Sequence, residues 1–103
     1  MTLEYANEDI ELLVRQIYTK RYKKYKSNKA LRLALSKVVG LLMNAPDIDA
    51  VKQMRSLNFE WIAERQCYSV RVGYTSKFRL MMDVRAETIT LILIELTEHY
   101  GDH

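Results

Sequence analysis

The sequence predicts an α+β fold in the order β-α-α-β-β-β, with a helical hairpin packed on one face of a mostly antiparallel sheet. Two observations lead to this prediction. The first half of the chain carries apolar residues at helical spacing, and the second half alternates apolar and polar residues as half-buried strands do. A length of 103 residues suits one domain, 1–103, with a modest core.

The first half is expected to contain a short strand at Leu3–Tyr5 and then two helices. Asn7 can cap the first helix, because acidic residues fill the turn that follows it. The apolar stripe expected for this helix is formed by Ile10, Leu13, Val14, Ile17, Tyr18 and Tyr25. Its last turn is expected to be basic and to contain Lys23, Lys24 and Lys26. Ser27 or Asn28 can cap the second helix, and Pro46 marks its end.

The second half is expected to supply the rest of the sheet. Residues 47–56 are predicted to be a loop or a short helical turn, and residues 57–61 alternate as a strand does, which would add a fourth strand to this half. Two strands within residues 68–84 follow, joined by a tight polar turn. The last strand, residues 88–96, is apolar on both faces and is therefore expected to be central. We expect the sheet face opposite the helices to be partly open.

One arginine occurs on each strand of the predicted hairpin, and the loop length decides whether the two meet. A two-residue loop would place Arg71 opposite the apolar Leu80. A three-residue loop keeps the apolar residues together, with Arg71 opposite Met81 and Arg79 opposite Gly73. The two arginines then become diagonal neighbours, roughly 7–8 Å apart, a spacing suited to phosphate. Two solvated arginines on a wet sheet face would give the same pattern.

Charge is distributed unevenly along the chain. Between Leu12 and Pro46 there are nine basic residues and no acidic residue, a distribution that attracts polyanions. Lys23 and Lys24 are therefore candidate RNA contacts, although a solvated helix face would explain them equally well.

Other functions are disfavoured by what the sequence lacks. The single Cys67 has no disulfide partner and no His or Cys at metal-binding spacing. The longest apolar run is too short to cross a membrane, and no signal peptide is recognisable. We therefore expect a cytoplasmic protein that uses no metal, no cofactor and no membrane.

The residues Glu98, His99 and Tyr100 follow the last predicted strand. A carboxylate, an imidazole and a phenol are the side chains best able to transfer protons. If they lie beside the arginines, the set suffices for RNA cleavage, in which the ribose 2′-hydroxyl is the nucleophile and no metal is needed.

The order of elements is shared with a known family, and so are four segments: Leu57-Asn-Phe-Glu60, Tyr68-Ser-Val-Arg-Val72, Phe78-Arg-Leu80 and Ile94-Glu-Leu-Thr-Glu-His-Tyr100. The chain resembles the HigB-like toxins, or plasmid maintenance system killer proteins, of the RelE/ParE superfamily. The resemblance implies a RelE-like fold and an mRNA endoribonuclease that acts in the ribosomal A site. It also implies a helix-turn-helix antitoxin, HigA-like, that holds the toxin inactive.

The resemblance also implies roles for single residues. Arg79 looks like the family's phosphate-stabilising arginine, with Arg71 beside it. Glu98, His99 and Tyr100 fall where many members carry Asp-Tyr-His, so Tyr and His are exchanged here. The chain has Trp-Ile-Ala-Glu where many members have Leu-Lys-Gly-Asp, and Arg65 or Lys77 could replace the missing lysine.

Two other functions share the same sequence features. A ParE-like inhibitor of DNA gyrase has this fold but needs no acid and base at its C-terminus. A non-toxic nucleic-acid-binding domain would use only the basic segment. The ribonuclease function predicts that Arg79→Ala abolishes growth arrest without unfolding the protein. A further hypothesis places the antitoxin on the basic segment around Lys23 and Lys24.

Overall fold

The computed structural model describes residues 1–73, 78–85 and 90–98 and contains three α-helices and five strands within them. The helical elements are α1 (Glu8–Val14), the 3₁₀ turn η1 (Lys23–Tyr25), α2 (Lys29–Asn44), α3 (Ile48–Gln53) and the 3₁₀ turn η2 (Arg55–Leu57). The strands are β1 (Thr2–Tyr5), β2 (Glu60–Ile62), β3 (Cys67–Arg71), β4 (Arg79–Arg85) and β5 (Thr90–Thr97). The predicted α+β class and the strand at the N-terminus are confirmed.

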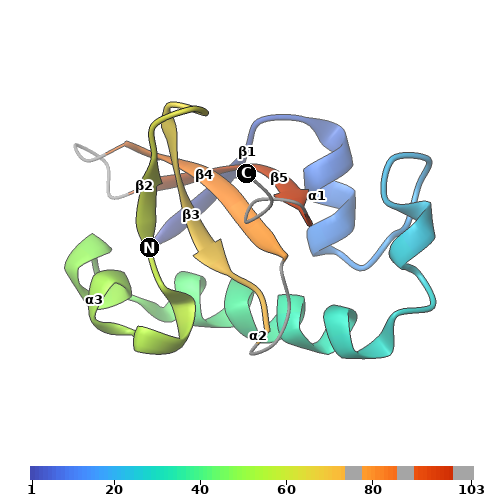
Figure 1. The fold of residues 1–103 in the computed structure, drawn as a ribbon, viewed down its shortest axis with the longest axis horizontal. Helices are drawn as coiled ribbons and strands as arrows, with labels where there is room; N and C mark the ends of the chain where they lie inside the picture. The colour runs from blue at the N-terminus through green and yellow to red at the C-terminus, as the bar shows by residue number, and fades with distance from the viewer. Residues whose placement is uncertain (74–77, 86–89, 99–103) are drawn as a thin grey trace.

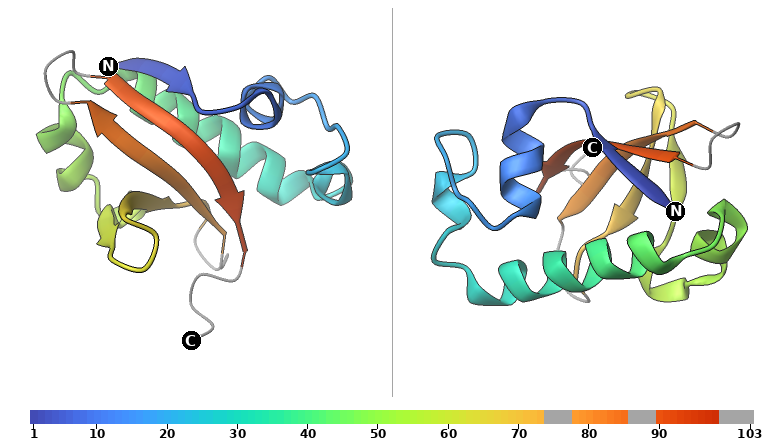
Figure 2. Two further views of the ribbon diagram at one scale, coloured as in Figure 1. Left: turned by 90° about the horizontal axis from the view of Figure 1, so that it is seen from above. Right: turned by 180° about the vertical axis from the view of Figure 1, so that it is seen from behind.

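The five strands form one sheet in the order β1-β5-β4-β3-β2 (Figure 1). Every neighbouring pair is antiparallel except β1 and β5, which are parallel and lie side by side in both views of Figure 2. β5 is therefore an interior strand, as its apolar sequence predicts. The main core lies between α1, α2 and one sheet face, where Ile10, Leu35 and Leu42 pack with Val70 and Leu80. We call this the helix face and the opposite side the second face.

The first helix is much shorter than predicted, because it ends at Val14 rather than near Lys26. Gln16 adopts a left-handed conformation with φ of 64°. Its N–H donates to the Leu13 carbonyl, and the Ile17 N–H donates to the Leu12 carbonyl. These two bonds form a Schellman ending, which usually has glycine at the left-handed position. Glutamine there gave no stop signal in the sequence, so Lys23 and Lys24 belong to η1 and not to a last helical turn.

Asn28, and not Ser27, caps α2, because its side chain accepts a hydrogen bond from the Leu31 N–H at 3.1 Å. We expect Asn28→Ala to lower the free energy of unfolding by about 1 kcal/mol, the usual effect of losing such a cap. Ser27→Ala is the matched control and should change it by less than about 0.5 kcal/mol. Urea denaturation of both variants measures the difference, and equal effects would contradict the assignment.

The predicted strand at residues 57–61 is only partly correct. Leu57 ends the turn η2, and Asn58 follows in a left-handed conformation with φ of 44°. An extended strand cannot pass through that conformation, so pairing starts at Glu60. The kink turns the Asn58 carbonyl towards β4, where it accepts a hydrogen bond from Arg79 at 2.7 Å.

The register of the β3–β4 hairpin differs from the predicted one by two residues. Arg71 lies directly opposite Arg79, and Ser69 lies opposite Met81. Gly73 is the physical reason, because its φ of 89° takes the chain out of the strand early. Beyond Arg71, the Val72 N–H donates a hydrogen bond to the Phe78 carbonyl at 3.0 Å. A shift of two residues is even, so the two arginines still share a face as predicted.

The second face is less open than the sequence predicts. Ile62, Cys67 and Met81 are buried there in a small second core that Ile94 also contacts. Ser69 is buried beside them. A register shift between Met81 and Met82 helps to form this cluster, because Met81 pairs with Glu95 and Met82 with Leu93. Ile94 is then the extra residue of a bulge, which changes the direction of a side chain.

Candidate functional site

The predicted site residues lie on two neighbouring rows of the second face. One cross-strand row runs from Arg71 through Arg79 to Thr97, the last residue of β5. The row next to it runs through Glu60, Ser69, Met81 and Glu95. Because cross-strand partners point to the same face, the structure brings the two arginines together and places the exit of β5 beside them.

Arg79 is a buried arginine, with only 6% of its surface exposed. Its Nε donates to the Ser69 Oγ at 2.7 Å, and its Nη2 donates to the Asn58 carbonyl. The same Nη2 lies 3.3 Å from the Glu60 carboxylate, which neutralises the charge. These partners fix the guanidinium and use much of its donor capacity. Arg79 is thus a structural centre of the second face, and a substrate phosphate would have to compete with its protein partners.

Arg71 is the more available of the two arginines. It is half-buried at the end of β3 and lies opposite another arginine. Among the residues that the structure describes, none forms an ion pair or a hydrogen bond with its guanidinium. Like charges at opposite strand positions repel, and Arg79 is already neutralised by Glu60. Arg71 therefore has donors left for an external anion.

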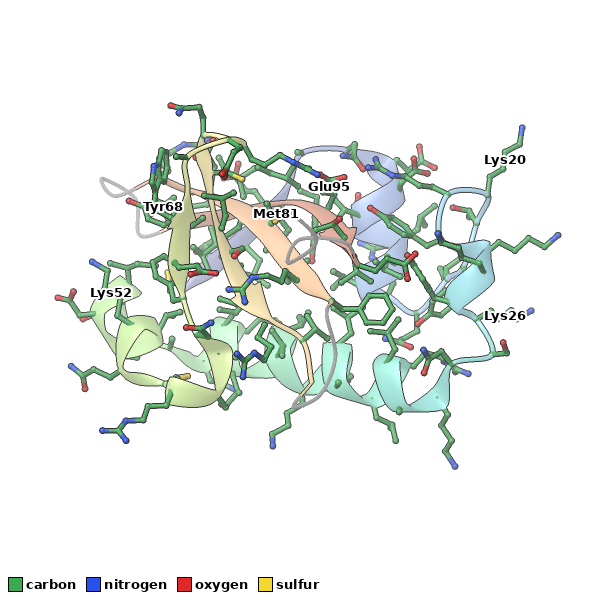
Figure 3. All side chains as sticks on the ribbon, viewed as in Figure 1. Lys20, Lys26, Lys52, Tyr68, Met81 and Glu95 are labelled. Atoms are coloured by element: carbon green, nitrogen blue, oxygen red, sulfur yellow. The ribbon has the colours of Figure 1, made fainter. Side chains whose placement is uncertain are left out.

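Glu95 joins two arginines from distant parts of the chain, and sequence reasoning did not identify it. Its carboxylate accepts from Arg21 at 2.7 Å and also pairs with Arg65. Glu95 on β5 is the cross-strand partner of Met81 on β4, and Figure 3 labels both residues. Arg65, a predicted RNA contact, is therefore paired with the Glu95 carboxylate of the same chain. Glu95 is the single acid within the apolar β5, a signal that could have identified it.

Glu98, the first of the predicted proton-transfer residues, binds the basic segment. Its carboxylate accepts from the Lys24 Nζ at 3.2 Å. This hydrogen bond raises the pKa of Lys24, so the ammonium group stays charged. Tyr25 lies under the same ammonium group, and burial raises the pKa of its phenol. Lys24 and Glu98 together hold the start of the C-terminal segment against η1, so the Glu98 carboxylate is paired with a cation of that turn.

The remaining predicted residues divide into two groups. Lys23 is exposed on η1, near the part of the chain from which Lys20 and Lys26 project into solvent (Figure 3). Lys77, His99 and Tyr100 lie outside the described residues, and so do Tyr74 and Thr88 of the predicted strands. The acid–base assignment of His99 and Tyr100 therefore stays a prediction.

Cys67 is a buried and unreactive cysteine. The thiol is buried in the second core, and burial raises its pKa, so it stays protonated. Across residues 1–73, 78–85 and 90–98, no cluster of three or more His, Cys, Asp or Glu could hold a metal ion. In those same ranges, no helix is long and apolar enough to cross a bilayer.

A scan against models of protein families and a search of curated proteins return no significant match for this chain.

Proposed function

We propose that this protein is the toxin of a type II toxin–antitoxin system and cleaves mRNA on the ribosome without a metal ion. One observation carries the proposal. Arg71, Arg79 and Thr97 pair across neighbouring strands, so two arginines share one row of the sheet with the last residue of β5, after which the C-terminal residues follow. That arrangement combines phosphate-binding groups with a segment whose sequence holds an imidazole and a phenol.

The chemistry follows from these groups. The ribose 2′-oxygen attacks the adjacent phosphorus, and the bond from phosphorus to the 5′-oxygen breaks, leaving a 2′,3′-cyclic phosphate. A base removes the 2′-hydroxyl proton, and an acid protonates the 5′-oxygen. We assign these two roles to His99 and Tyr100, in an order that the residues do not fix. Arg71 stabilises the charge that develops on the phosphate.

Arg79 supports the reaction by position more than by contact. Its bonds to Ser69 and Asn58 hold β3, β4 and the start of β2 together, so the strand that carries Arg71 is kept in place. Lys24 has a similar supporting role, because it fixes Glu98 directly before the two proposed proton-transfer residues. Preorganisation of this kind is what a phosphoryl transition state requires from a protein.

A second function is favoured by the occupied state of Arg79. A ParE-like inhibitor of DNA gyrase would act through protein contacts and would need no free phosphate-binding arginine. The pairing of Arg79 with Ser69, Asn58 and Glu60 and the attachment of Glu98 to Lys24 are both compatible with such a role.

Deletion of residues 98–103 separates the two functions. After induction in a bacterial host, the full chain should stop growth and create new transcript 5′ ends within coding regions. The deletion should abolish both effects if the protein is a ribonuclease. The gyrase inhibitor would keep growth arrest after the deletion and would change plasmid supercoiling instead. Growth arrest with unchanged transcript ends would refute the nuclease proposal.

A further inference from the structure

A groove of about 250 Å³ lies where α2 meets η2 and the end of β3. Its walls are mainly aliphatic, and the side chains of Leu33, Val38, Leu41 and Leu57 line it. The charged side chains among its described lining residues are Lys37 and Arg71, and no acid is among them. The groove is therefore an apolar cleft with a positive rim.

The neighbouring surface of α2 continues the same pattern. Lys29, Leu33 and Lys37 are spaced four residues apart, so they follow one another along one face of the helix. All three are exposed, and Leu33 has 63% of its surface in water. No acidic residue occurs anywhere in α2. A positive field thus surrounds a largely exposed hydrophobic side chain.

Arg71 indicates that a ligand in this groove carries a negative charge. A half-buried cation loses part of its hydration and normally recovers it from an acid or a carbonyl. The guanidinium of Arg71 has no such partner among the described residues, and it lies opposite a second arginine. An anionic group placed in the groove between Arg71 and Lys37 would offset this cost.

The size of the groove indicates the class of occupant. Sites for small molecules usually have about 300–1,000 Å³ and enclose most of the ligand. This groove is smaller and partly open to solvent, and it suits one or two side chains of a longer segment. An amphipathic segment places such side chains in a groove while its polar residues meet the rim.

We infer that the groove is the docking site for an acidic amphipathic segment of a partner protein. One or two large apolar side chains of that segment insert between Leu33 and Leu57, and its carboxylates bind Lys37 and Arg71. The inference does not depend on RNA cleavage, because it rests only on the shape, burial and charge of this surface. It also differs from the hypothesis of an antitoxin on Lys23 and Lys24, which lie on η1.

A peptide selection tests the inference with the complete chain. A displayed library of random 12-residue peptides is selected on the wild-type protein and counter-selected on the variant Lys37→Glu. The enriched sequences should combine Asp or Glu with Leu, Ile or Phe. Affinities of the enriched peptide are then measured by fluorescence anisotropy. Leu33→Asp and Lys37→Glu should each weaken binding at least about tenfold, and added salt should weaken it further.

Two matched controls keep the test decisive. Met43→Asp changes another exposed apolar residue of α2, and Lys20→Glu changes another exposed lysine. Both variants should bind the peptide as the wild type does. Loss of binding in the controls, or enrichment without acidic residues, would overturn the inference. A selection that enriches no peptide would also overturn it, as would binding of dodecanoate alone. A third contrary result is a dimer in sedimentation that Leu33→Asp separates, because a second copy of the chain would then cover the groove.

Discussion

Replacing Arg79 with alanine should lower the free energy of unfolding by about 2–4 kcal/mol, the loss expected when buried polar partners are abandoned. The change removes the donors that satisfy the Ser69 hydroxyl and the Asn58 carbonyl, and it leaves the Glu60 carboxylate without its cation. Urea denaturation monitored by circular dichroism measures the effect. A loss of this size is a large part of the stability of a small domain.

Arg85→Ala is the matched control on the same strand. The Arg85 guanidinium pairs with Glu4 at 3.1 Å, but both side chains are close to half exposed. Surface pairs of this kind contribute about 0–1 kcal/mol. Similar losses for the two variants would show that Arg79 is not a structural centre. The expectation that Arg79→Ala leaves the fold intact is therefore replaced, and loss of toxicity in that variant would not by itself identify a catalytic group.

Arg71→Ala should reduce RNA cleavage at least about 100-fold while the free energy of unfolding changes by less than about 0.5 kcal/mol. The small effect on stability follows because Arg71 has no ion pair among the described residues and faces a like charge. The large effect on activity follows if its free donors stabilise the transition state. Cleavage of a short mRNA bound to purified ribosomes measures the rate, without any partner protein present.

Two further variants define the role of Arg71. Arg71→Lys keeps the charge but loses bidentate geometry, and it should recover only part of the rate. Arg65→Ala removes a cation of the same site whose carboxylate partner also pairs with Arg21, and its effect should be small. An Arg71→Ala protein that cleaves at the wild-type rate would exclude the proposed chemistry.

Local signals in the sequence predicted much of the fold. Asn7 and Asn28 cap helices because their side chains accept hydrogen bonds from the N–H groups of Ile10 and Leu31. Alternation identified β3 and β4, since one face of each is buried against the helices. The errors came from left-handed residues at Gln16 and Asn58, because residues other than glycine give a weak signal for that conformation.

The site was predicted less completely than the fold. The parity of the hairpin loop placed Arg71 and Arg79 on one face, and the structure confirms that placement. Alternation could not reveal that Arg79 is buried, because its partners come from Asn58, Glu60 and Ser69 on other segments. The pairing of Glu95 with Arg21 and Arg65 was missed for the same reason, since contacts between distant residues leave no local pattern.

The parallel pairing of β1 with β5 determines when the sheet can be completed during synthesis. Thr2 lies beside Thr90, and Tyr5 lies beside Leu93. When β1 emerges from the ribosome it must therefore wait, without this partner, until β5 follows. Contacts between such distant residues slow folding, because a long loop must close before they form. Between the synthesis of β1 and that of β5, the nascent chain thus has an edge that another protein could bind.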